Sequence, residues 1–391
     1  MNVIQKLRYS LILFFILLGF AESSQAQMLQ WQQINSTAGS VRCFAANSTA
    51  LFAGAEGRGI LRSTNNGETW VAVNTGLTNQ FVYALLTVGE RIFAGTQLGV
   101  FISEDNGATW NKAAINQSIL SLSANSTTLF AGTLFGGIFR STDGGVSWTA
   151  SNSGFTTRTI LSISASTDGS TVLIGTQFSN GIFRSIDNGQ TWTKAENNDG
   201  GVYIQSIAMS SATSFIAVEN FTGGNILSST DKGAKWTVRA GFPNESALAL
   251  VVRGETVFVG TRNKGVFRSN DNGETWIAAN TNIANRTVYA LFLNGSALFA
   301  GTNAGIWRVT NAITTNVHTR EPSIAASIFP NPAIDEVAIC FDLSSPQLVK
   351  LSIFNTQGVE INSLIKQEIL NGRQCILWNT KFFLKRNSVI A

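Results

Sequence analysis

The sequence predicts an all-β protein, a seven-bladed β-propeller followed by a small β-sandwich-like C-terminal domain. An eight-residue motif of the form S-x-D-x-G-x-[TS]-W, here called the turn motif, occurs six times and ends at Trp70, Trp110, Trp148, Trp192, Trp236 and Trp276. Successive motif tryptophans are 38 to 44 residues apart, which matches one four-stranded propeller blade. Charged residues make up only 13% of the chain and Gly is abundant, as in turn-rich β proteins.

Each repeat divides into four short strands. In the second repeat, the first three are expected at 82–86, 91–96 and 99–103, and the fourth at 109–113, after the turn motif. The first two segments are continuous apolar runs, which is typical of strands that are covered on both faces. Neighbouring blades would supply this cover.

The turn motif is interpreted as structural. Its Asp can accept backbone N–H bonds in a tight turn, its Gly can adopt positive φ, and its Trp can pack on the blade. The first copy has Asn in place of Asp, and the fifth has Lys235 in place of Thr. A catalytic or metal site requires one unique constellation, whereas these residues recur in every copy: Asn65, Asp105, Asp143, Asp187, Asp231 and Asp271.

The seventh repeat is incomplete. Strands are expected at 288–292, 297–302 and 305–309, but Val309 stands where the motif Ser should be and no motif Trp follows. Trp31 lies 39 residues before Trp70, one full period, without a motif before it. We therefore expect residues 31–34 to pair with 305–309, which closes the ring and removes its open edges.

The two ends of the chain have other patterns. Residues 1–26 are predicted to be a secretory signal peptide, with Lys6 and Arg8, an apolar run at 11–20, and small residues before a cut after Ala26. A membrane anchor is less favoured because the apolar run is short. The propeller is assigned to 27–311, a linker to 312–327 and the C-terminal domain to 328–391, with strands at 336–341, 349–354 and 374–378.

The rare residue types limit the chemistry. Cys340 and Cys375 could form a disulfide or remain two buried thiols, and Cys43 is the third cysteine. The single His318 argues against His-based metal sites and a Ser-His-Asp triad, so neither a metal nor a cofactor is expected. The basic residues are scattered and the net charge is only +4, so no nucleic-acid partner is expected. A monomer is expected.

The candidate site residues are those on the face opposite the turn motif. There, loops join strand two to three and strand four to the next blade. Candidate ligand-binding residues on these loops are Arg58, Gln97, Phe135, Gln177, Phe178, Phe221, Arg262, Lys264 and Arg286, with Phe155 and Phe242 among the loop aromatics. Glu56, Glu219 and Glu245 are the candidate catalytic carboxylates. The alternative is that all of these are ordinary turn residues on a rim.

A further repeated feature is an arginine in the third strand. Arg62, Arg140, Arg184, Arg268 and Arg308 each follow an apolar residue. Recurrence at one blade position favours a structural role, with the stems packed along the sheet and the charged heads solvated or paired.

The turn motif series resembles that of the Asp-box, or BNR, propellers, which include sialidases, xyloglucanases, sortilin-type receptors and photosystem assembly factors. The resemblance covers about residues 29–310. It implies the propeller fold but not one activity, because functions differ within this group.

The C-terminal region resembles the sorting domain of the type IX secretion system of Bacteroidetes. Phe329-Pro330-Asn331-Pro332-Ala333 matches its opening, and residues 349–358 match its middle. Residues 379–386 lack the Gly and Tyr of the usual final strand. The resemblance implies contact with the type IX machinery and a secreted or cell-surface location.

The expected function is a binding or scaffold module for an extracellular carbohydrate or protein. The alternative is a sialidase-like or xyloglucanase-like glycoside hydrolase, which needs two carboxylates about 5–10 Å apart. A sialidase would also need three Arg, which Arg58, Arg158, Arg262 and Arg286 could supply, and a Tyr. Against a sialidase, Tyr83 and Tyr289 occupy matching positions in strands expected to be core, and the Arg-Ile-Pro motif common in sialidases is absent. Against a xyloglucanase, this chain has one propeller whereas xyloglucanases have two.

Overall fold

The computed structural model describes residues 15–20, 29–178, 181–196, 203–220, 222–283, 286–313, 327–329, 336–354 and 360–379. The chain divides into two compact units, Met28–Thr315 and a second formed by Met1–Gln27 with Asn316–Ala391. Every described element is a β-strand. Among the described residues, no helix is long and apolar enough to cross a bilayer.

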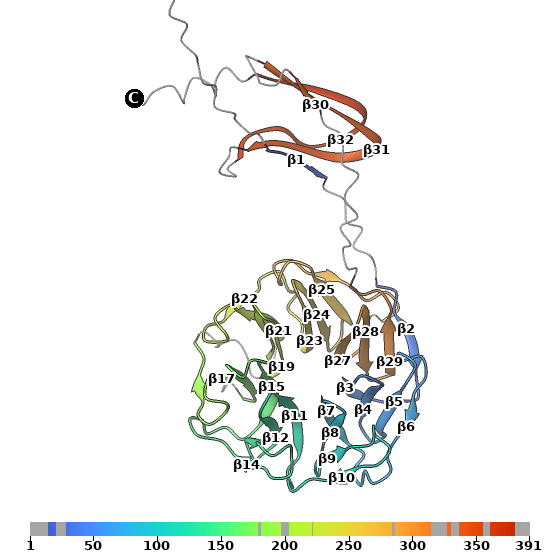
Figure 1. Ribbon diagram of the computed structural model, residues 1–391, viewed down its shortest axis with the longest axis vertical. Coiled ribbons are helices and arrows are strands. Elements are labelled where there is room, and N and C mark those ends of the chain that lie inside the picture. The colour runs from blue at the N-terminus through green and yellow to red at the C-terminus, as the bar shows by residue number, and fades with distance from the viewer. Residues whose placement is uncertain are drawn as a thin grey trace, which may run out of the picture. The chain divides into compact units, whose positions relative to one another are not determined.

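The larger unit is a seven-bladed propeller of four-stranded antiparallel sheets, so the predicted fold class is confirmed (Figure 1). Blade 1 contains β3 (Val41–Ala46), β4 (Leu51–Ala55), β5 (Gly59–Ser63) and β6 (Val71–Ala72). Blade 2 contains β7 (Val82–Val88), β8 (Arg91–Thr96), β9 (Gly99–Ser103) and β10 (Asn111–Lys112), and blade 3 contains β11 (Ile119–Ala124), β12 (Leu129–Thr133), β13 (Ile138–Ser141) and β14 (Thr149–Ala150). Blade 4 contains β15 (Ile160–Ala165), β16 (Val172–Thr176), β17 (Ile182–Ser185) and β18 (Thr193–Lys194), and blade 5 contains β19 (Tyr203–Met209), β20 (Ser214–Asn220), β21 (Gly223–Ser229) and β22 (Thr237–Val238). Blade 6 contains β23 (Ala247–Arg253), β24 (Thr256–Thr261), β25 (Val266–Ser269) and β26 (Ile277–Ala278), and blade 7 contains β27 (Val288–Asn294), β28 (Ala297–Thr302), β29 (Gly305–Val309) and β2 (Gln32–Asn35).

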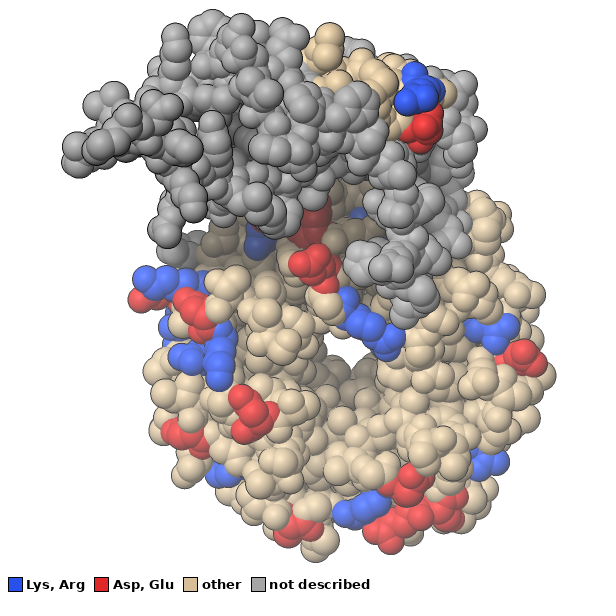
Figure 2. Space-filling model, turned by 45° about the horizontal axis from the view of Figure 1, so that its top comes forward, with Lys and Arg blue, Asp and Glu red and all other residues tan. Residues whose placement is uncertain are grey.

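The first strand of every blade lines a central channel. Figure 2 shows the opening at the centre of the ring, with charged side chains spread around the rim rather than gathered in one patch. The second strands are buried along their length, as β4 and β12 illustrate. Their apolar runs are therefore explained by the neighbouring blades on both sides.

The turn motif forms the same hydrogen-bonded turn in each of the six blades that contain it. In blade 2, Asp105 accepts from the Thr109 N–H at 2.8 Å and from the Ser103 hydroxyl at 2.8 Å, and the Gly107 N–H donates to Ser103. Gly107 has φ of 84°, and a Cβ there would lie 3.0 Å from the Phe52 ring of the preceding blade. The motif thus joins neighbouring blades as well as turning the chain.

The third-strand arginines also reach the next blade. The Arg62 Nη1 donates to the Asn106 carbonyl at 2.9 Å, and the Arg308 Nη1 donates to the Asn66 carbonyl at 2.9 Å. Arg268 is buried and bonds Asn270 within its own blade. The structural role that was predicted for this arginine position agrees with these contacts.

Blade 7 is closed by the N-terminal strand, as predicted. Gln32 pairs with Arg308, Gln33 with Trp307 and Asn35 with Ile306. Trp31 is only 2% exposed, and its indole Nε1 donates to the Ala279 carbonyl at 2.7 Å. Trp110 makes the equivalent bond to the Val73 carbonyl, so Trp31 occupies the place of a motif tryptophan.

The smaller unit contains β1 (Phe15–Phe20), β30 (Ser327–Phe329), β31 (Glu336–Phe354) and β32 (Glu360–Asn379), with β32 paired along β31. The two strands predicted at 336–341 and 349–354 are joined in β31, and the run at 374–378 lies in β32. The register shifts between Leu343 and Gln347, where Pro346 cannot donate a backbone hydrogen bond.

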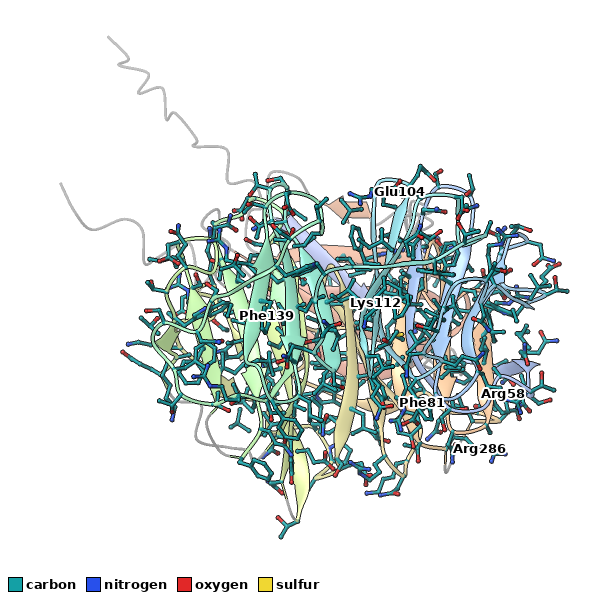
Figure 3. The ribbon with its side chains drawn as sticks, turned by 90° about the horizontal axis from the view of Figure 1, so that it is seen from below. Arg58, Phe81, Glu104, Lys112, Phe139 and Arg286 are labelled. Carbon is teal, nitrogen blue, oxygen red and sulfur yellow. A yellow bond between two sulfur atoms is a disulfide. The ribbon has the colours of Figure 1, made fainter. Side chains whose placement is uncertain are left out.

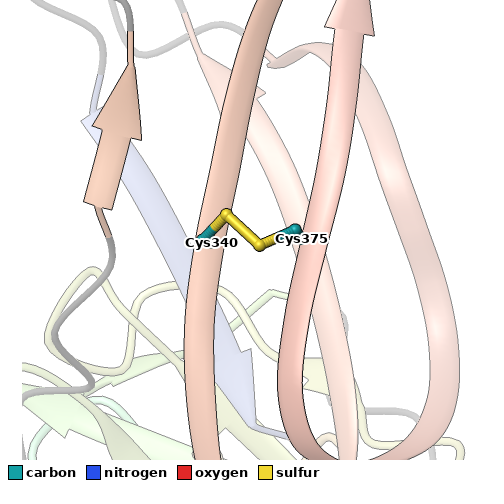
Figure 4. Close-up of a disulfide and its surroundings, with 2 residues drawn as sticks. All are labelled: Cys340 and Cys375. Carbon is teal, nitrogen blue, oxygen red and sulfur yellow. A yellow bond between two sulfur atoms is a disulfide. The ribbon is translucent and has the colours of Figure 1, made fainter.

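A disulfide joins Cys340 of β31 to Cys375 of β32, which decides between the two alternatives for these residues (Figure 4). β1 pairs with the second half of β31, and it falls within the predicted signal peptide. Cleavage after Ala26 would remove β1 and leave that edge of β31 unpaired. The cleavage itself, the domain boundaries and the sorting function remain predictions. His318, most of the predicted linker and residues 330–335 lie outside the described residues.

Candidate functional site

The propeller has two chemically distinct faces. Figure 3 shows Glu104, in a turn motif, on one side of the disc and Arg58, Phe81 and Arg286 on the opposite side. The second side, here called the loop face, carries the strand two-to-three loops and the connections between blades. The described candidate site residues belong to these loops or to the strand ends beside them, although Phe155 and Phe242 are buried.

All three candidate carboxylates have partners. Glu56 is ion-paired with Arg42 at 2.6 Å through one oxygen. Both oxygens of Glu219 are engaged, one by Arg262 at 2.6 Å and the other by the Gln205 side-chain amide at 2.6 Å.

Glu245 is buried and likewise uses both oxygens. One accepts from the backbone and side-chain amides of Asn263, each at 3.2 Å, and the other lies 3.6 Å from the Lys264 Nζ. Arg262 and Lys264, which were predicted as ligand-binding cations, are therefore already partnered. Of Glu56, Glu219 and Glu245, only Glu56 keeps an oxygen that neither accepts a hydrogen bond nor faces an ion-pair partner among the described residues.

Three loop-face arginines have no ion-pair partner among the described residues. These are Arg58, Arg158 and Arg286, all exposed. The Arg286 guanidinium lies 6.0 Å from the centre of the Trp307 ring. The described part of this face therefore carries unpaired positive charge but no unpaired carboxylate.

Apolar side chains project from the loops of three consecutive blades. Leu98 of blade 2 is 51% exposed, Phe135 of blade 3 is 76% exposed and Phe178 of blade 4 is 63% exposed. Phe178 has positive φ and its ring centre lies 5.8 Å from that of Tyr203. Exposed large apolar groups on neighbouring loops are typical of a binding surface.

The contacts of the remaining candidate residues do not point to a ligand. Gln97 donates its backbone N–H to the Phe81 carbonyl, and Gln177 bridges to Tyr203 across neighbouring blades. Phe221 lies outside the described residues. Phe155 and Phe242 are not loop aromatics free for a ligand: both are buried, packed against Trp192 and Trp276 respectively.

The sequence reasoning missed a ring of residues around the channel. Every inner strand contains a register shift near its start, at the second residue in six strands and at the third in β19, so one residue is bulged out of each ladder. The bulged residues, here called the bulge ring, are Arg42, Tyr83, Leu120, Leu161, Gln205, Leu248 and Tyr289, and all of them line the channel cavity. Tyr83 and Tyr289 were expected in the core, but both are half-buried and line the channel.

Arg42 is the most connected member of the bulge ring. Its guanidinium lies 3.7 Å from the centre of the Tyr289 ring while it pairs with Glu56. Burial raises the pKa of Tyr83 above its ordinary value, the nearby Glu56 carboxylate raises it further, and Arg42 lowers it in part. Tyr289, Arg42 and Tyr83 belong to three adjacent blades, so this cluster spans the point where the ring closes.

On the turn-motif face, the motif carboxylates are bound within their own turns. Hydrogen bonds from Thr109, and then from Ser103, lower the pKa of Asp105 to about 2. The Asp105 carboxylate therefore stays ionised at neutral pH, and its oxygens accept hydrogen bonds from its own turn. Among the described residues, no three His, Cys, Asp or Glu lie together as metal ligands.

Comparisons with known proteins support the fold. No protein-family model and no curated protein matches the chain. The GH74 xyloglucanase from Xanthomonas campestris is similar, with 16% identity, a TM-score of 0.60, and coverage of 86% of this chain and 63% of that one. YCF48 from Cyanidioschyzon merolae has 15% identity and a TM-score of 0.58, with 72% and 98% covered.

A third similar structure is the extracellular domain of a putative hybrid two-component system from B. thetaiotaomicron. It has 16% identity and a TM-score of 0.61, with 88% of this chain and 47% of that chain covered. The chain therefore spans less than two thirds of the xyloglucanase and about half of this sensor domain. At these identities, the likeness is one of fold.

Proposed function

We propose that this protein is a binding module that holds an extracellular glycan or protein on the loop face of its propeller. The observation that carries the proposal is the distribution of unpaired groups. Exposed apolar tips at Leu98, Phe135 and Phe178 share this face with arginines that lack ion-pair partners. Aromatic residues and Arg are enriched at protein interfaces relative to the rest of the surface.

The competing function, glycoside hydrolysis, is less well supported. It requires two carboxyl groups that face each other across a bound sugar. Both oxygens of Glu219 and of Glu245 are engaged by neighbouring side chains. Glu56 alone has a free oxygen, and one carboxylate does not supply the acid and the nucleophile or base that the mechanism needs.

The structural neighbours support both classes of partner. One is a xyloglucanase, and YCF48 has also been solved bound to D1 peptide. The similarity to Asp-box propellers, suggested by the turn motif, is compatible with either a glycan or a protein partner. An anionic or polar partner with an apolar segment would complement the loop face best.

We further propose that the protein is secreted or displayed at the cell surface through its signal peptide and a type IX sorting domain. The basic, apolar and small-residue pattern of 1–26 and the motifs at 329–333 and 349–358 support this. The Cys340–Cys375 disulfide suits an oxidising compartment.

The proposal is tested with the secreted form of the full chain on glycan and peptide arrays. A rim variant that combines Phe135→Ser, Phe178→Ser and Arg58→Glu should lose binding at least tenfold. Glu104→Gln, on the opposite face, is the matched control and should bind normally. Equal binding by the rim variant and the unchanged protein would contradict the proposal, as would release of reducing sugar ends that Glu56→Gln abolishes.

A further inference from the structure

We propose that the bulge ring at the channel mouth binds a single neutral pyranose unit of a glycan. The inference rests on the proposed binding function and identifies its ligand class. The residues that carry it are Arg42, Tyr83, Leu120, Leu161, Gln205, Leu248 and Tyr289, with Glu56 behind Arg42.

The bulges direct these side chains into the channel. In each inner strand, the residue before the bulge is fully buried, as Val82 and Ile119 illustrate, whereas the bulged residue is half-buried. A bulge adds one residue to a strand and re-aims its side chain, and bulges are common beside functional sites. The inner strands start at the loop face, so a bulge at the second or third residue lies near that end of the channel.

The bulge ring is also where the repeats stop resembling one another. The second strands and turn motifs repeat nearly the same residues in successive blades, which indicates a structural role. At the bulge position the side chains are one Arg, two Tyr, three Leu and one Gln. They therefore form a unique constellation on a repetitive scaffold.

Arg42, the only charged member of the bulge ring, is already paired, which favours a neutral ligand there. The +1 charge of Arg42 is offset by the −1 charge of Glu56, and that of Arg262 by Glu219. A charged ligand would lose its hydration without meeting an uncompensated opposite charge.

The polar and apolar groups of the bulge ring suit a sugar. Glu56 has one free carboxylate oxygen, and neither the Gln205 side-chain oxygen nor the phenol of Tyr83 or Tyr289 has a hydrogen-bond partner among the described residues. These groups can accept from and donate to sugar hydroxyls. Leu120, Leu161 and Leu248 supply the apolar part of the wall for the C–H face of the ring.

The cavity volume suits a part of a ligand about the size of one sugar ring. It is about 240 Å³, below the ~300–1,000 Å³ of pockets for drug-sized ligands. The competing occupant is an apolar peptide side chain, which would bury the free oxygens of Glu56 and Gln205 without replacing their bonds to water. A glycan end or branch sugar satisfies them.

The test is calorimetric titration of the secreted full chain with methyl glucoside, methyl galactoside, methyl xyloside and glucuronate. At least one neutral glycoside should bind, and glucuronate should bind more weakly. Tyr83→Ala and Gln205→Ala should each weaken binding at least tenfold. Leu161→Trp, which fills the cavity but keeps the polar groups, should abolish it. Asn111→Ala, on the exposed outer strand β10, is the matched control and should not change it.

Three results would overturn the inference: no binding of any neutral glycoside, unchanged affinity in the Leu161→Trp and Gln205→Ala variants, or tighter binding of glucuronate. If array binding is lost in the rim variant but kept in all three bulge-ring variants, the loop-face function stands and the sugar inference fails. If the unchanged protein binds neither array, the proposed function itself fails. If a peptide binds at the channel mouth and none of the glycosides does, the occupant is a polypeptide side chain and the sugar inference fails.

Discussion

At the scale of single residues, the propeller depends on size complementarity between consecutive blades. A second-strand Gly faces a β-branched residue of the next blade's inner strand at six junctions, and at the seventh Ala217 and Ala247 take these two positions within one buried cluster. The Gly pairs are Gly54–Val82, Gly95–Ile119, Gly132–Ile160, Gly175–Ile204, Gly260–Val288 and Gly301–Val41. Ala217 has one methyl group more than the Gly at the other junctions, and Ala247 is smaller than the Val or Ile at those junctions.

This complementarity predicts that Gly95→Ala destabilises the propeller. A Cβ on Gly95 would lie 2.7 Å from the Ile119 Cγ2, so the side chain or backbone must shift. Overpacking of this kind costs ~1–3 kcal/mol of the free energy of unfolding, which urea denaturation measures.

The same substitution should be much less harmful when Ile119 is also Ala, since the pair then matches Ala217–Ala247. The double variant is compared with Ile119→Ala alone, which carries the cavity cost. An equal penalty for Gly95→Ala in both backgrounds would show that the two residues are not coupled.

The turn-motif carboxylates predict an acid-dependent loss of stability. The pKa of Asp105 is about 2 in the folded protein, below its ordinary 3.8, because Thr109 and Ser103 donate to the carboxylate. A lowered folded pKa stabilises above the unfolded pKa, and the contribution disappears as pH falls from about 4 towards 2.

Asp105→Asn should therefore lower stability near pH 6 but not near pH 2. Asn65 shows that Asn preserves the turn, because its side-chain oxygen accepts from the Thr69 N–H at 3.0 Å. The carboxylate is exposed, so the difference should be ~1 kcal/mol or less after solvent screening. It is measured by urea unfolding at several pH values, and a pH-independent difference would contradict the assignment.

At the scale of elements, ring closure by β2 is the contact on which the propeller most depends. β2 supplies the outer strand of blade 7, and without it β29 would have an open edge. Trp31 anchors the strand through its buried ring and its bond to Ala279.

Trp31→Ala should lower the free energy of unfolding by ~3–5 kcal/mol, as is typical of a buried Trp. The exposed edge of β29 should also promote association, which size-exclusion chromatography detects. Trp31→Phe is the matched control, since it keeps an aromatic ring but loses the hydrogen bond, and it should cost less. A Trp31→Ala protein that remains as stable as Trp31→Phe would show that closure does not need this anchor.

At the scale of the whole molecule, the chain consists of two units that differ in how they are stabilised. The propeller relies on apolar packing between blades, and its only cysteine, Cys43, is unpaired. The C-terminal unit contains the Cys340–Cys375 disulfide, which closes a segment with a sequence separation of 35.

Reduction should therefore destabilise the C-terminal unit alone. A disulfide that closes a loop of this length contributes ~2–4 kcal/mol, mainly by restricting the unfolded chain. Calorimetry of the full chain with and without a reductant measures both unfolding transitions. Cys43→Ser is the matched control for thiol effects, and a fall in the propeller transition on reduction would contradict the prediction.

The sequence by itself determined the blade number, the position of the turn motif and the pairing of residues 31–34 with 305–309. These follow from local turn chemistry and from a fixed period, which act within about forty residues. The loop face was also predictable, because strand order alone decides on which side each loop lies.

Only the tertiary structure decided which side chains meet. The ion pairs of Glu56, Glu219 and Glu245, the burial of Phe155 and Phe242, and the bulge ring depend on contacts between separate strands and blades. A bulge shifts the register by one residue, which the apolar runs of the inner strands do not reveal. Tyr83 and Tyr289 therefore looked like core residues in the sequence but line the channel in the folded protein.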